Sequence, residues 1–498
     1  MGEEVSINAF SYVDRRHFRT KLRRCVDALR VLIDEDRFDT ERTLTGLELE
    51  LNLVTEDCDP AMRNAEVLSA LAHDMANETG SVQPELGKFN LELNLTPRTV
   101  NGDGLSSYER VLRDWLHRID EHAAKVHASL ALIGMLPTVR SEHASPDVLS
   151  HSGRYRLLNE RILAARGEEI ALDIEGVERV QSHYGSIAAE SVNTSVQYHL
   201  QLTPGQFPRY WNAAQAIAAA QLAAGANSPY LFGSRLWDET RIVLFEQATD
   251  TRPRELREQG VRPRTWFGEA WIGDVGDLFE ENLRFFPALL SILEAEDPFT
   301  VLDRGGVPQL GELRLHNGTI YRWNRPVYDV TASGPHLRVE NRVLPAGPTP
   351  ADICANLAFF LGLVTEVAAA DTPIEATMTF AQARDNFYTA ARYGLGSVLE
   401  WPGIGRVDAR RLIAETLLPL AANGLDRLGT DRRDRDRFLS IIYGRCSTGV
   451  NGAVWQDRCV RSFEERDGLD RDAALHAMMR RYLRYASTNT PVHEWPER

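Results

Sequence analysis

The segment TGLELELNL, residues 45–53, alternates apolar and polar side chains from Leu47 onwards. Leucines occupy the odd positions, and the polar residues between them are Glu48, Glu50 and Asn52. A period of two is typical of a β-strand that buries one face and leaves the other polar. The segment therefore predicts a strand with two carboxylates on its polar face.

Three more segments have the same period: KFNLELNL (88–95), SVNTSVQYHLQL (191–202) and HLRVENRV (336–343). Their polar positions hold acids, amides, one histidine and two arginines. The side chains among them that could bind a ligand or act in catalysis are Glu92, Gln197, His199, Arg338, Glu340 and Arg342. The segment LRLHNGTIYRW (313–323) adds a predicted hairpin, because Asn-Gly suits a two-residue primed turn.

Helical periodicity predicts the remaining elements. We expect helices over residues 14–35, 105–131, 207–223, 349–369, 406–422, 431–444 and 470–485, with the last hundred residues almost entirely helical. No continuous β-α-β pattern occurs. The predicted class is therefore α+β with a mainly antiparallel sheet.

The composition narrows the classes of partner. The chain has 498 residues and a net charge of −15, which argues against nucleic acid as the main partner. Its five cysteines are odd in number and form no CxxC pair, as expected in a reducing cytoplasm. The N-terminus shows no signal-peptide pattern. The most apolar stretch, 353–370, includes Asn356, Thr365 and Glu366, so we interpret it as a buried helix and expect no membrane partner.

If the four strands are neighbours, Glu48, Glu50, Glu92 and Glu340 point into one space. Carboxylates that close repel one another strongly unless a cation lies among them. Oxygen ligands suit Mg²⁺ or Mn²⁺, and two such ions can clamp a transferring phosphoryl group. The alternative is that each strand shows its polar face to solvent, which is common for antiparallel sheets.

An ordered series of segments resembles the carboxylate–amine ligases related to glutamate–cysteine ligase, whose catalytic fold is shared with glutamine synthetase. The resemblance runs from about residue 43 to about residue 460. The segments are GLELE (46–50), Glu85 with Glu92, SVQYHLQL (195–202), ANSPYLFGSRLWDETR (226–241), VENR (339–342), AARYGL (390–395) and TGVNGAVWQDR (448–458).

The resemblance implies a role for each matching residue. Glu50, Glu85 and Glu92 would hold one divalent ion, and Glu48, Gln197 and Glu340 a second. Many members have histidine where this chain has Gln197, whose carbonyl oxygen can also ligate a metal. Arg342 would contact the transferred phosphoryl group, with His199 beside it. Substrate-binding candidates are Arg154 and Tyr155, in SGRYRLLNERI (152–162). Arg235 and Arg241 are candidates for binding either a substrate carboxylate or ATP.

The resemblance also implies an architecture and a reaction. Residues 1–375 would form a catalytic domain whose curved sheet makes a funnel-like active site flanked by helices, with a helical region, 376–498, packed on it. ATP, with Mg²⁺ or Mn²⁺, would phosphorylate the γ-carboxylate of a glutamate-like acid, and an amine such as that of cysteine would displace phosphate. The partners would be these small molecules.

Two other functions compete with this hypothesis. A glycoside hydrolase would use two of the strand carboxylates as acid and nucleophile, but it would not explain the arginines or more than two converging acids. A non-catalytic binding protein on a ligase-like scaffold would turn Glu50, Glu92 or Glu340 away from the site. The sequence has neither a GxxxxGK[ST] loop nor a GxSxG elbow. It indicates neither the amine nor the oligomeric state.

Overall fold

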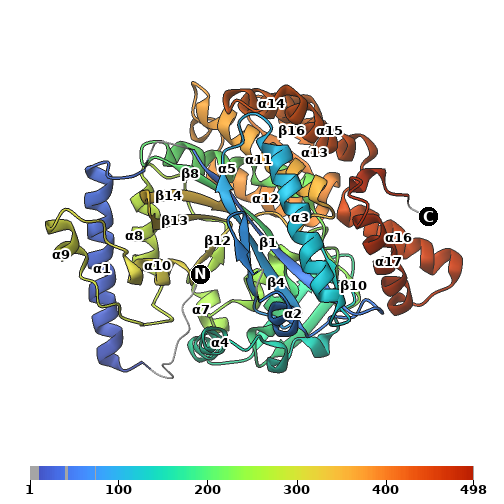
Figure 1. Ribbon diagram of the computed structural model, residues 1–498, viewed down its shortest axis with the longest axis horizontal. Coiled ribbons are helices and arrows are strands. Elements are labelled where there is room, and N and C mark those ends of the chain that lie inside the picture. The colour runs from blue at the N-terminus through green and yellow to red at the C-terminus, as the bar shows by residue number, and fades with distance from the viewer. Residues whose placement is uncertain (1–9, 40–42, 73–74, 497–498) are drawn as a thin grey trace.

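The computed structural model describes residues 10–39, 43–72 and 75–496. An eight-stranded sheet lies at its centre, with helices around it (Figure 1). The strands are β1 (Thr45–Val54), β2 (Ala76–Asn77), β3 (Gly80–Pro84), β4 (Asn90–Arg98), β5 (Ser129–Ala131), β8 (Val196–Leu202), β13 (Asn324–Thr331) and β14 (Gly334–Asn341). Their order is β13-β14-β8-β1-β4-β3-β2, with β5 also paired to β1, and all these pairs are antiparallel.

The four strands predicted from alternation are four consecutive neighbours: β14, β8, β1 and β4. The odd-numbered leucines of β1 are at most 1% exposed, whereas Glu48 and Glu50 are only partly buried. The apolar face of the sheet thus forms part of the core, and the acids lie on its other face, as the alternation predicts.

Smaller two-stranded units lie outside the main sheet. They are β6 (Ile170–Glu175) with β7 (Arg179–Tyr184), β9 (Tyr230–Leu231) with β10 (Ser234–Arg235), β11 (Thr265–Trp266) with β12 (Tyr321–Arg322), and β15 (Val398–Trp401) with β16 (Gly405–Asp408). Only the β11–β12 pair is parallel among these four units.

Helices surround the sheet (Figure 1). In order they are α1 (Tyr12–Asp34), α2 (Asn64–Ala70), α3 (Gly104–Ala124), α4 (Gly153–Arg166), α5 (Phe207–Gly225), α6 (Thr240–Ala248), α7 (Arg254–Glu258), α8 (Val275–Phe285), α9 (Pro298–Asp303), α10 (Gly311–Asn317), α11 (Pro350–Ala369), α12 (Phe380–Tyr393), α13 (Ala409–Leu412), α14 (Leu418–Arg427), α15 (Arg432–Thr448), α16 (Gly452–Asp467) and α17 (Arg471–Ala486). The α+β class and the helical C-terminal region are therefore confirmed. The curvature of the sheet into a funnel and the domain boundary at residue 375 stay predictions.

Helix α11 packs against the apolar face of the sheet. The Tyr198 ring of β8 lies 6.1 Å from the Phe360 ring, and the Tyr198 hydroxyl donates to the Ile353 carbonyl at 2.7 Å. Among the residues described, α11 is the one helix long and apolar enough to span a membrane, and 94% of its apolar stretch is buried in the protein. This burial agrees with the interpretation of 353–370 as a core helix.

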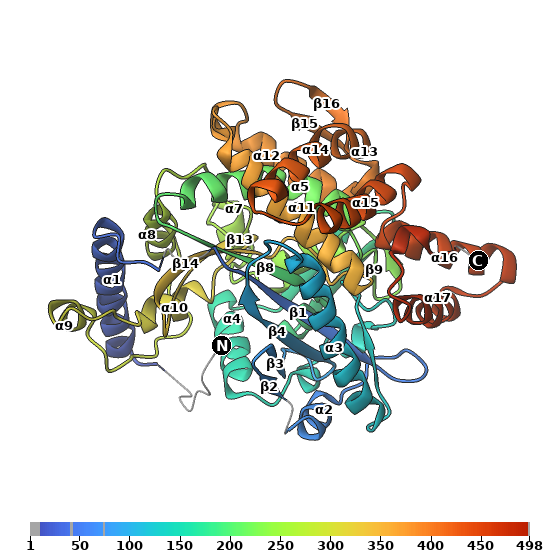
Figure 2. The same ribbon diagram turned by 45° about the horizontal axis from the view of Figure 1, so that its top comes forward.

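The first helix lies beside segments from the middle of the chain. Figures 1 and 2 show α1 next to α8, α9 and α10. Ion pairs join them, among them Lys21 with Glu312 at 2.9 Å and Arg24 with Asp297 at 2.8 Å. Ser11 caps the N-terminus of α1: its hydroxyl accepts from the Asp14 N–H at 3.1 Å, which satisfies one of the unpaired amides of the first turn.

The hairpin predicted at residues 313–323 is wrong. Residues 311–317 form α10, and the chain continues into β12. Gly318 has φ −66° and ψ −9°, whereas a primed turn needs positive φ. The buried Asn317 side chain instead donates to the Pro326 carbonyl at 2.8 Å, so a tertiary contact fixes this residue at a helix end.

Two predicted helices have different limits in the structure. Helix α3 ends at Ala124, and residues 129–131 form β5 at the sheet. The segment predicted as a helix over 406–422 begins inside β16 and becomes helical at Ala409, with a π-helical turn over 413–417. Pro419 follows this turn and has no N–H to donate to residue 415, which accounts for the irregular hydrogen bonding.

Helices α11 and α14 cross at two glycines. A Cβ added at Gly424 would lie 1.8 Å from the Gly362 carbonyl oxygen, and one at Gly362 would lie 2.2 Å from the Ala421 carbonyl oxygen. Neither obstacle is a flexible side chain. The crossing of the core helix α11 therefore depends on the lack of side chains at both positions.

We predict that Gly424→Ala destabilises the protein by about 1–3 kcal/mol, because the helices must separate. This outcome is the opposite of the usual effect of Ala in a helix, which is stabilising by about 1 kcal/mol relative to Gly. Urea unfolding followed by circular dichroism measures the difference. Gly205→Ala, where an added Cβ meets nothing within 4 Å, is the control. Unchanged or higher stability of Gly424→Ala would contradict the prediction.

Candidate functional site

The strand register brings the predicted polar residues onto one face of the sheet. Glu340 of β14 lies opposite His199 of β8, and Gln197 of β8 lies opposite Glu48 of β1. Glu50 of β1 lies opposite Glu92 of β4. Residues paired across a sheet share a face, so these six side chains project to the same side. The premise that the four strands are neighbours is correct.

Two arginines neutralise Glu340. Arg325, from the outer strand β13, makes a bidentate contact with both carboxylate oxygens at 3.0 and 2.8 Å. Arg342 donates from Nη1 to Glu340 Oε1 at 2.8 Å. Burial opposes ionisation of Glu340, but Arg325 and Arg342 hold its pKa well below the usual range. Glu340 is 2% exposed and remains ionised at neutral pH.

Gln197 links this arginine pair to β1. Its carbonyl oxygen accepts from Arg342 Nη1 at 2.7 Å, and its amide nitrogen donates to Glu50 Oε1 at 3.1 Å. The second oxygen of Glu50 accepts from the Ser195 N–H at 2.6 Å. An amide can join a donor and an acceptor in this way, because it has both functions on one planar group.

His199 lies between Arg338 and Glu48. Arg338 Nε donates to His199 Nδ1 at 3.0 Å, so Nδ1 has no proton and the ring proton resides on Nε2. Nε2 lies 3.1 Å from Glu48 Oε1. Although burial opposes it, the interaction with His199 lowers the pKa of Glu48 below its ordinary value.

The β4 end of the face is richer in acids than in arginines. Burial, then the charges of Glu92 and Glu50, raises the pKa of Glu85 well above its ordinary value. Burial, then the charge of Glu48, raises the pKa of Glu92. Glu92 accepts from the side-chain amides of Asn94, at 2.6 Å, and of Gln83. These carboxylates lack a cationic partner of the kind that Glu340 has, and their raised pKa values express the repulsion between them.

Glu190 also belongs to this region, and no pattern in the sequence predicts it. It lies in the 3-10 helix Ile187–Val192, where no periodic pattern marks it. Burial, then the charge of Glu50, raises its pKa to about 8, against the opposing charge of Arg342. Glu190 also acts on Glu85 and Tyr321, which places it beside the acid-rich end.

The four predicted substrate residues have different positions. The Tyr155 hydroxyl lies 3.4 Å from Glu85 Oε1, at the acid-rich end. Arg154, next to it on α4, acts electrostatically on Tyr155 and Tyr321. Arg241 is buried, pairs with Glu239 at 3.0 Å and donates to the Arg342 and Val343 carbonyls, so it holds the end of β14 in place.

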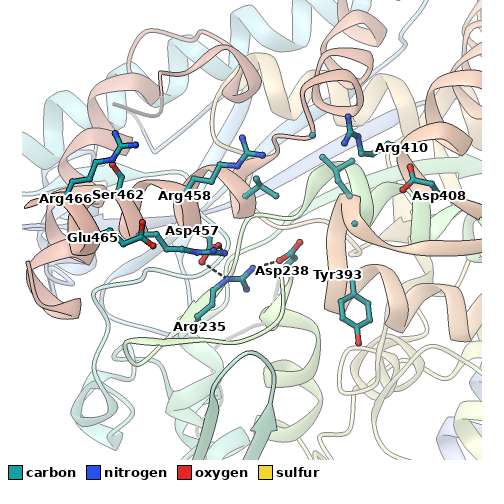
Figure 3. A pocket seen from close by; sticks show the side chains of 15 residues that line it. Arg235, Asp238, Tyr393, Asp408, Arg410, Asp457, Arg458, Ser462, Glu465 and Arg466 are labelled. Carbon is teal, nitrogen blue, oxygen red and sulfur yellow. Dashed lines mark hydrogen bonds and ion pairs between the residues drawn. The ribbon is translucent and has the colours of Figure 1, made fainter. Parts of the chain in front are cut away.

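Arg235 lies elsewhere, in the wall of the cavity shown in Figure 3. It pairs there with Asp238 and with Asp457, whose Oδ1 is 3.1 Å from Arg235 Nε. The structure thus does not bring Arg235 together with the residues of the sheet face. Its predicted role with substrate is untested.

The acid-rich end suits a divalent cation better than the arginine-rich end does. Among residues 10–39, 43–72 and 75–496, no three acidic, His or Cys side chains already converge as a metal site. Glu50, Glu85 and Glu92 nevertheless offer carboxylate oxygens whose repulsion a cation would relieve. The second predicted set of ligands is Glu48, Gln197 and Glu340. Arg325 and Arg342 already donate to Glu340, and Arg342 also donates to the Gln197 carbonyl, so these hydrogen bonds must break before a metal can bind there.

We predict that Glu190→Gln changes how stability depends on pH. The folded-state pKa of about 8 exceeds the ordinary value of 4.5, so the folded protein retains a proton that the unfolded chain loses between these values. Wild-type stability therefore falls through this window, by about 1.4 kcal/mol per unit of pKa difference, and the variant escapes that loss. In thermal melts from pH 5 to 8, the melting temperature of Glu190→Gln should exceed that of wild type by an amount that grows with pH. A melting-temperature difference that stays constant with pH would refute the prediction. So would an equal growth of the difference in the exposed control Glu255→Gln.

Comparisons with known proteins identify the family of this chain and structures with a similar fold. The family model for glutamate–cysteine ligase family 2 matches residues 44–468. Among solved structures, glutamate–cysteine ligase from Francisella tularensis, determined in complex with AMP, has a TM-score of 0.54 and 12% identity, covering 92% of this chain and 91% of that one. A bifunctional glutathione synthetase from Pasteurella multocida has a TM-score of 0.49 and 14% identity over 94% of this chain and 55% of that one.

The comparison with curated proteins finds no match. Since the family model spans most of the chain, from β1 to the end of α16, this protein belongs to glutamate–cysteine ligase family 2.

Proposed function

We propose that this protein is an ATP-dependent carboxylate–amine ligase that forms a γ-glutamyl amide, with glutamate as the acid and cysteine as the leading amine. The observation that carries the proposal is that Glu50 and Glu92 face each other on the sheet, with Glu85 and Arg342 close to them. Family membership and the resemblance in fold to the Francisella tularensis ligase support it. The AMP in that ligase is a reason to expect a nucleotide here.

In this proposal, Glu50, Glu85 and Glu92 hold a divalent cation, Mg²⁺ or Mn²⁺. The fit rests on the donor set, which consists of hard oxygen ligands with raised pKa values. When bound, the cation would neutralise phosphate charge next to the acids. The second set, Glu48, Gln197 and Glu340, stays a prediction that requires Arg325 and Arg342 to release Glu340, and Arg342 to release Gln197.

The proposed reaction proceeds in two steps. The γ-carboxylate of glutamate attacks the γ-phosphorus of ATP, which forms an acyl phosphate and releases ADP. The amine then attacks the acyl carbon, phosphate leaves with the former bonding electrons, and the amine nitrogen loses a proton. No protein nucleophile is needed, so the chain contributes positioning and charge stabilisation.

In this proposal, Arg342 contacts the transferred phosphoryl group. Its guanidinium contacts Glu340 and Gln197 through Nη1, which fixes its position. Arginine matches the geometry of phosphate oxygens and stabilises charge that develops on them. His199, whose protonated Nε2 faces Glu48, supplies a donor on the same face. Arg154 and Tyr155 bind the amino-acid substrate in this proposal.

A screen of acid and amine pairs tests the proposed function. The purified protein is incubated with ATP, Mg²⁺ and one acid at a time, and ADP release is followed. Hydroxylamine traps the acyl phosphate as a hydroxamate. We expect glutamate to give both ADP and hydroxamate, and cysteine to replace hydroxylamine as acceptor. ADP release at background level with every acid would disprove the ligase. A cytoplasmic location and exclusively small-molecule partners remain predictions outside this test.

We predict that Glu92→Gln lowers turnover by about 100-fold or more and raises the Mg²⁺ concentration needed for half-maximal rate, because a neutral amide is a poorer ligand. The fold should be preserved, since a side chain of the same shape still faces Asn94 and Gln83. Steady-state kinetics over a Mg²⁺ series and circular dichroism measure both effects. Glu255→Gln, an exposed change on α7, is the matched control. Normal activity of Glu92→Gln would remove Glu92 from the site.

A further inference from the structure

Arg338 lies on the polar face of the sheet, and the reaction proposed above gives it no role. It is two residues before Glu340 on β14, so both side chains project to the same side. Its side chain is 21% exposed and contacts those of His199, His336 and Asp329. Two of these partners are imidazoles. An arginine that donates to a histidine nitrogen decides where the proton of that ring resides, and the His199 ring belongs to the site.

Arg338 leaves one nitrogen of each ring without a proton. Its Nε donates to His199 Nδ1 at 3.0 Å, and its Nη1 lies 2.9 Å from His336 Nε2. A guanidinium has donors only, so both ring nitrogens must accept. Burial, then the charge of Arg338, lowers the pKa of His336 to about 4, which keeps that ring able to accept at neutral pH. The one proton of the His199 ring is therefore on Nε2.

The two outer strands of the sheet hold Arg338 in this position. Its Nη1 lies 3.4 Å from Asp329 Oδ2 of β13. Asp329 is fixed in turn by Arg314 of α10, whose Nη2 lies 2.9 Å from Asp329 Oδ1. The strand register places Asp329 opposite His336, so both partners reach Nη1 together. These contacts orient Nε of Arg338 toward His199 without any bound substrate.

The remaining N–H of His199 is buried on the sheet face. His199 is 5% exposed, and its register partner on β1 is Gly46. A Cβ added at Gly46 would lie 3.2 Å from His199 Cβ and 3.5 Å from the ring atom Cδ2, so the ring packs on the Gly46 backbone. Glu48 Oε1 lies 3.1 Å from Nε2, yet no described residue accepts a well-directed hydrogen bond from this nitrogen. A buried donor of this kind costs free energy until a ligand supplies an acceptor.

We propose that Arg338 is a positioning residue: by donating to His199 Nδ1, it keeps the ring proton on Nε2, which then donates to an oxygen of the transferred phosphoryl group. This inference rests on the proposed ligase reaction. The oxygens of an ionised phosphate only accept hydrogen bonds, as do those of Glu48. With the proton on Nδ1 instead, His199 would turn a lone pair toward these oxygens. Arg338 thus acts on the reaction through His199 and needs no contact with the substrate.

A double-mutant cycle tests whether Arg338 acts through His199. Arg338→Met keeps a long side chain without a donor. We expect it to lower kcat by about tenfold or more and to change the KM for glutamate by less than about twofold, because the lost donor acts chiefly in the transition state. In the His199→Ala background, Arg338→Met should cause no further loss. Losses that multiply in the double variant, or a normal kcat of Arg338→Met, would overturn the proposal.

Arg314→Met is the matched control. It removes the same charge from a side chain that is 39% exposed and contacts Asp329 but not His199. We expect its kcat and KM to stay within about twofold of wild type. Equal losses in Arg314→Met and Arg338→Met would assign the effect to charge near Asp329 and would overturn the proposal. Circular dichroism checks that all the variants fold.

Nitrogen NMR of the full chain gives a readout that needs no turnover. Only the histidine nitrogens are isotopically labelled, and the His199 signals are those missing from His199→Ala. In the wild type we expect a directly bonded proton on Nε2 and none on Nδ1. In Arg338→Met the two nitrogens should share the proton, since Glu48 does not hold it in a directed hydrogen bond. A proton on Nδ1 in the wild type, or an unchanged pattern in Arg338→Met, would overturn the proposal. If the wild type had no ligase turnover, the proposed function would fail, and this spectrum would still show whether Arg338 sets the proton.

Discussion

Repulsion between carboxylates on one face of a single sheet is the constraint on which the rest of this site depends. The register of β14, β8, β1 and β4 fixes which acids face one another, and Glu50 directly opposes Glu92. In a partly dehydrated environment, each of these charges needs a partner. Glu340 has two arginines, Glu48 has His199, and Glu50 has an amide and a backbone N–H. The polar network is therefore part of what allows the sheet to form.

The charges of the carboxylates are neutralised to different extents at the two ends of the sheet face. At the β13–β14 side, Arg325 and Arg342 lower the pKa of Glu340. At the β4 side, burial and neighbouring acids raise the pKa of Glu85 and Glu92. One end thus presents positive charge suited to phosphate oxygens, and the other presents oxygens suited to a cation. Phosphoryl transfer needs both within one site, so the charge gradient is the strongest physical argument for that chemistry.

The periodicity of the sequence predicts the four central strands and their polar faces, because a half-buried strand must alternate. It does not predict their order, which depends on contacts between distant segments. Arg325 escapes prediction because Pro326 follows it, and proline usually argues against a strand inside a sheet. Here Arg325 lies on β13 at the edge of the sheet, where proline is tolerated.

Local signals fail where tertiary contacts override them. The Asn317-Gly318 pair has the composition of a hairpin turn, but the buried contact of Asn317 with Pro326 keeps it at the end of a helix. Glu190 has no signal at all, since it lies in a short irregular helix and reaches the site only through the fold. The resemblance of ordered motifs carries the prediction further than periodicity does. It also predicts a ligand role for Arg235, which the structure shows in the lining of a cavity, and this role stays a prediction.

The competing functions fit this pattern of charge less well. A glycoside hydrolase needs one protonated and one ionised carboxyl on either side of a sugar. Here the acids with lowered pKa values, Glu48 and Glu340, are already engaged by His199 and by arginines, and those with raised values lie together at the other end.

A binding protein on the same scaffold would have no need to retain mutually repelling acids, which cost stability unless a cation relieves them. Glu50, Glu92 and Glu340 all share one face, so the arrangement that would favour such a protein is not present among them. Retention of this repulsion is best explained by a reaction that uses it.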